Sequence, residues 1–491
     1  MPLIDSKTGR VRKDYSVEEL KEAARLMRGY DLAALACAGS GHAGGTLSAM
    51  DFTAALYLKV ARLDPENPGW PDRDRIIWST GHKAPNVYIG VAMTGAFPPE
   101  EVATLRRLNS RFQGHPHWLK FRAAEASTGS LGQGLSIGVG VAMAAKLDGK
   151  SFRAYVVNGD GELQEGSIWE AAMSAGHYGL DNLVSIVDQN RLQIDGWVRD
   201  VMDVDPIADK FRAFGWHAVE CDGHDMAAVL RAFEEAAATK GKPTVIVAHT
   251  TKGKGVDFME NVAGWHGKAP SMDEARKAFA QLGLDGKIDL DRMKRIADEH
   301  QKEADAALAE KMPKFAKDYW WNRQPLMKVQ MDPTRMGYGR ALQEGGADGR
   351  VVCLGADISG SIAIAKFYEG HPERAPKGKQ LSRFISVGIA EQNATTIAAG
   401  LAKEGKIPTF GTYGVFASGR NLDQIRTTVA YGGFNVLIAG AHGGVSVGPD
   451  GATHQALEDI SNVASIPEMT VVVPCDAIET KKATLALLFE V

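Results

Sequence analysis

The sequence is short of cysteine and of long apolar runs, and each shortage excludes a class of protein. Its four cysteines, Cys37, Cys221, Cys353 and Cys475, lie far apart, without the spacing of a disulfide framework or a zinc site. They fit a reducing, cytoplasmic environment. The best apolar run, residues 136–145, contains two glycines and is too short to span a membrane. The polar N-terminus lacks the apolar core of a signal peptide.

Concentrated positive charge is also missing. The net charge is −4 at pH 7 and no basic stretch could follow a phosphate backbone, so we expect neither nucleic acid nor a membrane as partner. What the chain has in excess is glycine, at 54 of 491 residues against a usual share of ~7%. These glycines gather before expected helices, where backbone amides can face an anionic ligand. A chain of this length predicts two or three domains.

Apolar runs alternate with helical patterns in the first half of the chain. Ser16 followed by Glu19 forms a capping-box pattern, which predicts a helix running towards Ala38. The expected strands are 153–158, 183–188, 217–221 and 244–248, and the expected helices between them include 167–178, 207–214 and 226–238. This alternation predicts a parallel sheet with helices on both faces, an α/β fold.

A charged helical stretch interrupts the alternation and predicts a linker over residues 285–331. A second alternating series follows it, so we expect modules at 1–284 and 332–491 joined by this linker. The expected strands of the second module are 351–355, 384–387, 409–411, 436–439 and 470–473, with helices at 390–403, 421–431 and 477–489.

Polar residues at two successive strand ends carry the clearest chemical signal. Gly159-Asp160-Gly161 follows one strand and Asp188-Gln189-Asn190 closes the next, with Asp160 and Asn190 thirty positions apart (190 − 160). In a parallel sheet both strand ends meet at the ligand-binding edge. A carboxylate and an amide oxygen suit Mg²⁺ or Ca²⁺, while glycines let the backbone approach a diphosphate. A tight turn beside an unrelated asparagine is the plainer alternative.

The segment GDGELQEGSIWEAAMSAGHYGLDNLVSIVDQNRLQIDG resembles the thiamine-diphosphate motif of transketolases, most closely the type whose two halves are often separate subunits. The likeness extends from about Leu20 to the C-terminal end. It implies that Asp160, Asn190 and the main-chain oxygen of Leu192 hold a metal, Mg²⁺ with Ca²⁺ or Mn²⁺ as alternatives. Gly161 would then lie against the cofactor diphosphate.

Histidines in glycine-flanked loops precede this motif at positions 42, 82 and 115. A lone histidine is more often structural, but three in such loops suit a site that binds sugar hydroxyls and phosphate. The resemblance implies that His82 contacts the diphosphate, while His42 and His115 face the substrate. It adds Gly129 and Leu131 against the aminopyrimidine and His266 towards the substrate. We expect 252–255, KGKG, to be a mobile, solvated loop.

Glu391 follows an expected strand and begins an apolar helix. This position predicts a partly desolvated carboxyl that can stay protonated near neutral pH. A helix N-terminal carboxylate favoured by the dipole is the plain alternative. The resemblance makes Glu391 the catalytic acid that activates the cofactor.

Further residues of the second half match the family in spacing. The resemblance implies ring-stacking by Tyr413 and Phe416, although Gly419 replaces an aromatic residue often found there. The other implied roles are sugar binding by His442 and Asp450, an aminopyrimidine contact for His454, a buttress at Asp357, and acceptor-phosphate contacts from Arg335 and Ser361. An arginine fork suits phosphate.

The resemblance implies two thiamine-diphosphate-binding modules and reversible transfer of a two-carbon ketol unit, from a ketose phosphate to an aldose phosphate, through a dihydroxyethyl adduct. It also implies a homodimer whose subunits share each site. One alternative is a 1-deoxyxylulose-5-phosphate synthase, although the polar histidines favour sugars over pyruvate. Another is a non-catalytic cofactor-binding homologue, against which Glu391, Asp160 and Asn190 argue.

The family's pattern continues past helix 477–489 with a strand that carries another arginine, and then with a third domain. We therefore expect the natural product to extend beyond Val491, since the second sheet would otherwise leave an edge uncovered.

Overall fold

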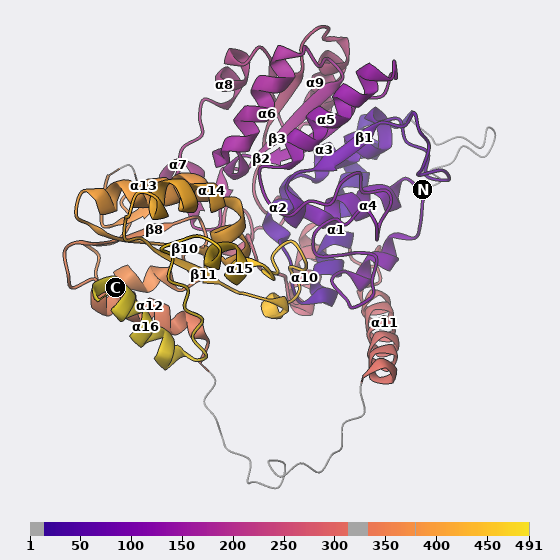
Figure 1. The fold of residues 1–491 in the computed structure, drawn as a ribbon. Coiled ribbons are helices and arrows are strands. Elements are labelled where there is room, and N and C mark those ends of the chain that lie inside the picture. Colours follow the sequence, from indigo (N-terminus) through magenta and orange to yellow (C-terminus); the bar gives the residue numbers. More distant parts are fainter. Residues whose placement is uncertain (1–13, 313–331, 379, 491) are drawn as a thin grey trace.

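The computed structural model describes residues 14–312, 332–378 and 380–490. Two parallel sheets, each with helices on both faces, form two modules that pack side by side (Figure 1). We call residues 14–312 the first module and residues 332–490 the second module. The fold class predicted from the sequence is confirmed. Within the described residues, none of the helices combines the length and apolarity needed to cross a lipid bilayer.

The first module is built on a five-stranded sheet in the order β1-β2-β3-β7-β6, all parallel. Its strands are β1 (Arg75–Trp78), β2 (Ala154–Gly159), β3 (Leu183–Gln189), β7 (Thr244–His249) and β6 (His217–Asp222). A short antiparallel pair, β4 (Leu192–Gln193) and β5 (Gly196–Trp197), follows β3.

Side chains of the central strands alternate between two apolar layers. Tyr155 and Val157 of β2 pack into the core that contains α1, α3, α4 and α9, whereas Val156 packs into the core of α5, α6 and α8. A strand buried on both faces reads as a continuous apolar run, which is why β2 and β3 were predicted to within a residue.

The helices of the first module include the capped helix expected from the sequence: the Ser16 side chain accepts from the Glu19 amide at 3.3 Å, and Glu19 accepts from the Ser16 amide at 2.9 Å. The helices are α1 (Val17–Ala38), α2 (Ala43–Ser48), α3 (Met50–Ala55), α4 (Ala84–Met93), α5 (Gly134–Leu147), α6 (Gly166–His177), α7 (Val198–Val201), α8 (Ile207–Ala213), α9 (Met226–Ala238), α10 (Met272–Gln281) and α11 (Leu290–Lys311).

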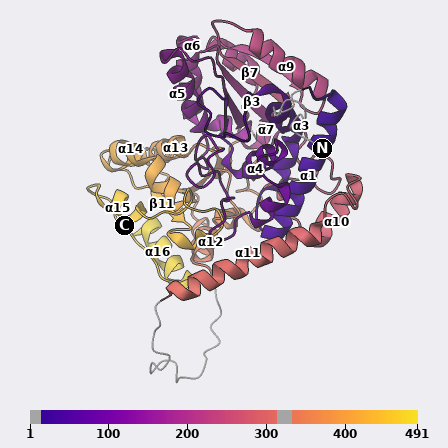
Figure 2. The same cartoon turned by 90° about the vertical axis from the view of Figure 1, so that its right-hand side faces the viewer.

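Helix α11 lies in the stretch predicted as a linker and leads away from α10 as one long helix (Figure 2). Its inner stripe, Leu290, Met293 and Ala297, is buried in the core of the first module. The charged face that dominates its sequence is turned outward, so its N-terminal half belongs structurally to the first module. The rest of the predicted linker, residues 313–331, lies outside the described residues.

The second module has a four-stranded parallel sheet in the order β11-β10-β8-β9. Helices α12 and α16 cover one face, and α13 covers the other. Its elements are α12 (Thr334–Gly345), β8 (Val351–Gly355), β9 (Phe384–Ser386), α13 (Glu391–Lys403), β10 (Ile407–Tyr413), α14 (Leu422–Gln424), β11 (Leu437–Ala441), α15 (Asp459–Ala464) and α16 (Ala477–Phe489).

One expectation for the second module is wrong. Residues 470–473 form no strand: no described strand lies beside them, and Val471, Val472 and Val473 are 38%, 45% and 66% exposed. Their β-branched side chains fit a strand, but a strand also needs a neighbour. The helix expected at 421–431 is present, as three residues of α14 followed directly by a π-helical segment, Ile425–Ala430.

A pair of glycines in α5 tests how closely this helix packs on β2. A Cβ on Gly138 would meet the Val156 side chain at 2.3 Å, whereas a Cβ on Gly140 would meet nothing within 4 Å. We expect Gly138→Ala to destabilise the protein by about 1–3 kcal/mol through overpacking. Gly140→Ala, the matched control, should be neutral or stabilise by about 0.5–1 kcal/mol. Denaturant unfolding measures both; equal effects of the two changes would contradict the packing.

Candidate active site

A cavity lies between the modules at the carboxyl ends of strands from both sheets. Asp160 follows β2, Asn190 follows β3 and Lys252 follows β7, while Asp357 follows β8 and Tyr413 ends β10. Most residues singled out from the sequence line it: His42, His82, His115, Gly129, Leu131, Asp160, Gly161, Asn190, Leu192, His266, Asp357, Glu391, Tyr413, Phe416, Asp450 and His454. Arg335, Ser361 and His442 do not.

One end of the cavity gathers the oxygens predicted to hold a metal. The Asp160 carboxylate accepts from the Arg191 amide at 2.5 Å and from the Gly161 amide at 2.9 Å. Burial, and then the nearby Asp188 carboxylate, raise the pKa of Asp160 to about 6. Asn190 and the Leu192 carbonyl lie beside it, so a carboxylate, an amide and a main-chain carbonyl line one wall.

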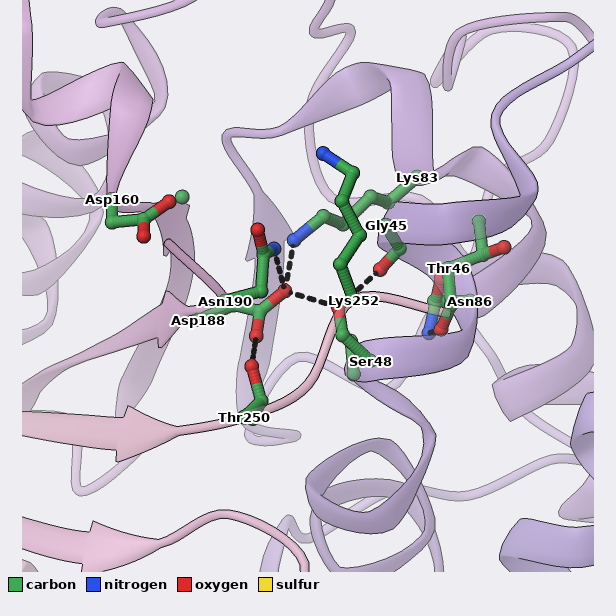
Figure 3. Close-up of polar contacts among 12 residues, drawn as sticks. Gly45, Thr46, Ser48, Lys83, Asn86, Asp160, Asp188, Asn190, Thr250 and Lys252 are labelled. Carbon is green, nitrogen blue, oxygen red and sulfur yellow. Dashed lines mark hydrogen bonds and ion pairs between the residues drawn. The ribbon is translucent and has the colours of Figure 1, made fainter. Parts of the chain in front are cut away.

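A buried aspartate that the sequence analysis overlooked organises this wall. Asp188 is 0% exposed and accepts from Asn190 Nδ2 at 2.9 Å and from Ser48 Oγ at 2.6 Å (Figure 3). Lys83 pairs with the same oxygen, and Thr250 donates to the other. Burial opposes ionisation of Asp188, but these partners outweigh it and its pKa is lowered. Because Asn190 donates to Asp188 through its nitrogen, its amide is held in one orientation.

Lys252 corrects the expectation of a mobile, solvated loop at 252–255. Its side chain is 1% exposed, and its Nζ donates to the Leu192 carbonyl at 2.6 Å and hydrogen-bonds to His266 Nδ1 at 2.5 Å. Burial lowers the pKa of Lys252 to about 8. A polar KGK run suggested solvent exposure, but its place directly after β7 turns the first lysine into the site.

His42, His82 and His266 form a cluster beside Lys83 and Lys252. The ring centroids of His42 and His82 are 5.2 Å apart, those of His82 and His266 5.3 Å, and those of His42 and His266 5.8 Å. Burial, followed by neighbouring positive charges, lowers the pKa of His42 to about 3 and holds the other two well below their usual range. All three are therefore neutral near pH 7 and can both donate and accept hydrogen bonds.

The opposite end of the cavity holds carboxyl groups. Glu391 is 3% exposed at the start of α13, and its Oε2 accepts from Arg420 Nη1 at 2.7 Å. The same arginine pairs with Glu165 of the first module. Burial raises the pKa of Glu165 to about 9, with Arg420 opposing and Glu391 adding to the shift. This end therefore keeps a proton among its carboxyls at neutral pH.

Aromatic residues form the wall that the second module contributes. His454 lies 5.6 Å from Tyr413 and 5.3 Å from Phe416, centroid to centroid, and stacks on His115 of the first module at 4.8 Å. Residues that do not line the cavity lie at its rim: Ser361 Oγ is 3.2 Å from the Tyr413 hydroxyl, and the His442 ring is 4.7 Å from the Tyr413 ring.

Arg335 is exposed near this rim. Its charge acts on His442, where burial and then Arg335 lower the pKa, and on Tyr413. The structure thus brings the three predicted rim residues, Arg335, Ser361 and His442, around Tyr413.

Contacts across the boundary join the modules at two aspartates. Asp450 pairs with Arg106 at 3.1 Å, and its carbonyl is 2.8 Å from His115 Nδ1. Asp357 accepts from the Ile194 and Asp195 amides at 3.1 and 2.9 Å. Burial and then Asp195 raise the pKa of Asp357 to about 7. Residues of both modules line this cavity, and the sharing of each site between two subunits, which the family resemblance implies, stays a prediction.

The residues present fit a metal-bound diphosphate. Among the described residues no group of three or more His, Cys, Asp or Glu side chains could hold a metal, but the predicted ligands are of another kind. Asp160, Asn190 and the Leu192 carbonyl are hard oxygen donors of the type Mg²⁺ prefers. The Leu192 carbonyl already accepts from the Lys252 ammonium, so it faces positive charge. Lys83 and Lys252 line the same cavity.

Fold and site together define a two-module α/β protein with a cavity that joins an oxygen- and lysine-lined end to a buried carboxyl end. The family model described as "Transketolase, thiamine diphosphate binding domain" matches residues 19–334, and "Transketolase, pyrimidine binding domain" matches residues 331–489. The chain therefore belongs to the transketolase family.

Comparisons with individual proteins agree with this family assignment. Human transketolase is 36% identical over 477 residues, which covers 95% of this chain and 72% of that protein. A 6-deoxy-6-sulfo-D-fructose transketolase subunit, SqwG of Clostridium sp., is 40% identical over 268 residues, covering 55% of this chain and 98% of that subunit. The crystal structure of Campylobacter jejuni transketolase covers 97% of this chain and 77% of its own, at 27% identity and a TM-score of 0.55.

The oxygen-lined end yields a test of the metal ligands. We expect Asp160→Ala to abolish retention of thiamine diphosphate in Mg²⁺, because the diphosphate would meet the protein without its neutralising cation. Isothermal titration calorimetry on the folded variant measures this. Asp200→Ala is the matched control, since Asp200 is 56% exposed on α7. Unchanged affinity in the Asp160 variant would remove Asp160 from the metal site.

Proposed function

We propose that the protein is a transketolase that reversibly transfers a two-carbon ketol unit from a ketose phosphate to an aldose phosphate. The observation that carries this is a single cavity with Asp160, Asn190 and the Leu192 carbonyl at one end and the buried Glu391 at the other. Family membership supports the assignment. We also propose Mg²⁺ as the metal, a homodimer as the assembly and the cytoplasm as the location.

Thiamine diphosphate, when bound, supplies a carbon nucleophile that cleaves and forms bonds next to a carbonyl. In our proposal Asp160, Asn190 and Leu192 hold its metal, with His82, Lys83 and Lys252 around the diphosphate. Gly161, which lines the same cavity, would lie against that group. Glu391 holds the proton that the pyrimidine ring needs, at N1′.

The histidines provide hydrogen bonds to the sugar without charge. Because burial keeps His42 and His266 neutral, each can donate to one hydroxyl or carbonyl oxygen and accept from another. His115 and Asp450, joined at 2.8 Å, are placed to orient the substrate chain, and His442 reaches it from the rim. Tyr413 and Phe416 exclude water from the pyrimidine side.

Glu391 is proposed to activate the cofactor and not to bind it. We expect Glu391→Gln to lower turnover by at least ~100-fold, because the amide keeps the size but cannot supply the acidic proton. Cofactor affinity should remain near the parent value. H/D exchange at the thiazolium C2 measures activation, and Glu373→Gln, at an exposed residue, is the control. Near-normal exchange in Glu391→Gln would exclude the role.

Phosphate recognition is proposed for Arg335. We expect Arg335→Gln to raise KM for aldose phosphates by ~10–100-fold, since a charged hydrogen bond is worth ~1.5–3 kcal/mol, with little change for unphosphorylated aldoses. Arg340→Gln is the control on the same helix, because Arg340 pairs with Asp332 and is 46% exposed.

The measurement is a coupled assay with a panel of ketose donors and aldose acceptors, each with and without phosphate. A 6-sulfonated ketose belongs in the panel because of the relative named a sulfofructose transketolase subunit. Ketol transfer from none of the donors, in protein that binds thiamine diphosphate, would favour a non-catalytic homologue. An equal loss for phosphorylated and unphosphorylated acceptors would contradict the role of Arg335.

A further inference from the structure

Arg420 occupies a position that none of the roles above uses. It ends the π-helical turn Phe416–Arg420, and its side chain is 10% exposed. Nη1 donates to Glu391 Oε2 at 2.7 Å and also binds Glu165. Nη2 donates to Ser130 Oγ and, at 3.3 Å, to the Leu131 carbonyl. One guanidinium thus joins Glu391 to two segments of the first module.

The contacts use the shape of the guanidinium as well as its charge. The Arg420 Cζ atom lies 4.6 Å from the centroid of the Phe416 ring, so the guanidinium packs over an aromatic side chain. The two Nη groups reach different partners, carboxylates on one side and the Ser130–Leu131 loop on the other. A lysine could supply the charge here but not this fork.

Arg420 is surrounded by three buried glutamates. Glu391 on α13, Glu165 before α6 and Glu162 all act on it, and each of the three is buried. His454 faces the same region from the second module. Glu162 is held by the Gly132 and Gly159 amides at 2.9 and 3.1 Å and by Ser79, so it is fixed independently. Arg420 is therefore the cation that Glu391 and Glu165 share.

We propose that Arg420 is a positioning residue: it fixes the Glu391 carboxyl against the Ser130–Leu131 loop. This inference rests on the proposed function, because it concerns the group that activates the cofactor. Without the fork the carboxyl is misplaced and activation slows. Cofactor binding, which Glu391 is proposed not to provide, changes less.

The test compares Arg420→Met, Arg420→Lys and the control Arg426→Met, an exposed arginine of the next turn. C2 H/D exchange is followed at one pH, and thiamine-diphosphate affinity is measured by calorimetry. We expect Arg420→Met to slow exchange by ~10–100-fold, as for a misplaced catalytic group. Arg420→Lys should not restore the full rate, because a lysine lacks the fork. Affinity should change less than the exchange rate.

Each outcome bears on one claim. A parent-like rate in Arg420→Met would overturn the inference, as would a full rate in Arg420→Lys. If Arg420→Met does not fold, the Arg420→Lys result decides the role of the fork, and an unshifted rate there rejects it. Absence of exchange in the parent protein would instead reject the proposed function. An equal shift in Arg426→Met would show that any lost surface charge produces the effect.

Discussion

The buried pair of Lys83 and Asp188 is the constraint on which the diphosphate end of the cavity depends. Both side chains are almost fully buried, where an unpaired charge costs several kcal/mol and breaking a pair ~3–5 kcal/mol. Asp188 also holds Ser48, Asn190 and Thr250. The start of α4, the end of α2 and the ends of β3 and β7 must therefore meet at one carboxylate. The orientation of Asn190 is a consequence of this packing and not a local property of its loop.

The cavity that results has unlike ends. Lys83 and Lys252 lie beside carboxylates and hard oxygens at the first end, whereas Glu162, Glu165 and Glu391 surround a single arginine at the second. Between them the histidines are neutral because burial disfavours their charged form. Cations beside hard oxygens at one end and a carboxyl group at the other suit a ligand that has an anionic tail and a ring able to share a proton.

Local signals in the sequence predicted the α/β elements, whereas the family resemblance implied most of the cavity lining. Asp160 and Asn190 could be paired because strand-end residues thirty positions apart converge in a parallel sheet. Asp188 and Lys252 could not, since their partners lie 140 and 60 residues away in Ser48 and Leu192, and an isolated lysine pattern looks solvated. The strand expected at 470–473 failed for the same reason: β propensity is local, but pairing is not.

Charged side chains of each module pair with partners in the other module. Asp450 of the second module finds Arg106 of the first, and Glu165 of the first finds Arg420 of the second. Asp357 accepts two main-chain amides across the boundary, groups that would otherwise need water or another acceptor. Docking of the modules and formation of the site are thus one event. Substitutions at the boundary should act on the site through module docking as well as directly, so boundary residues and lining residues cannot be treated as separate sets.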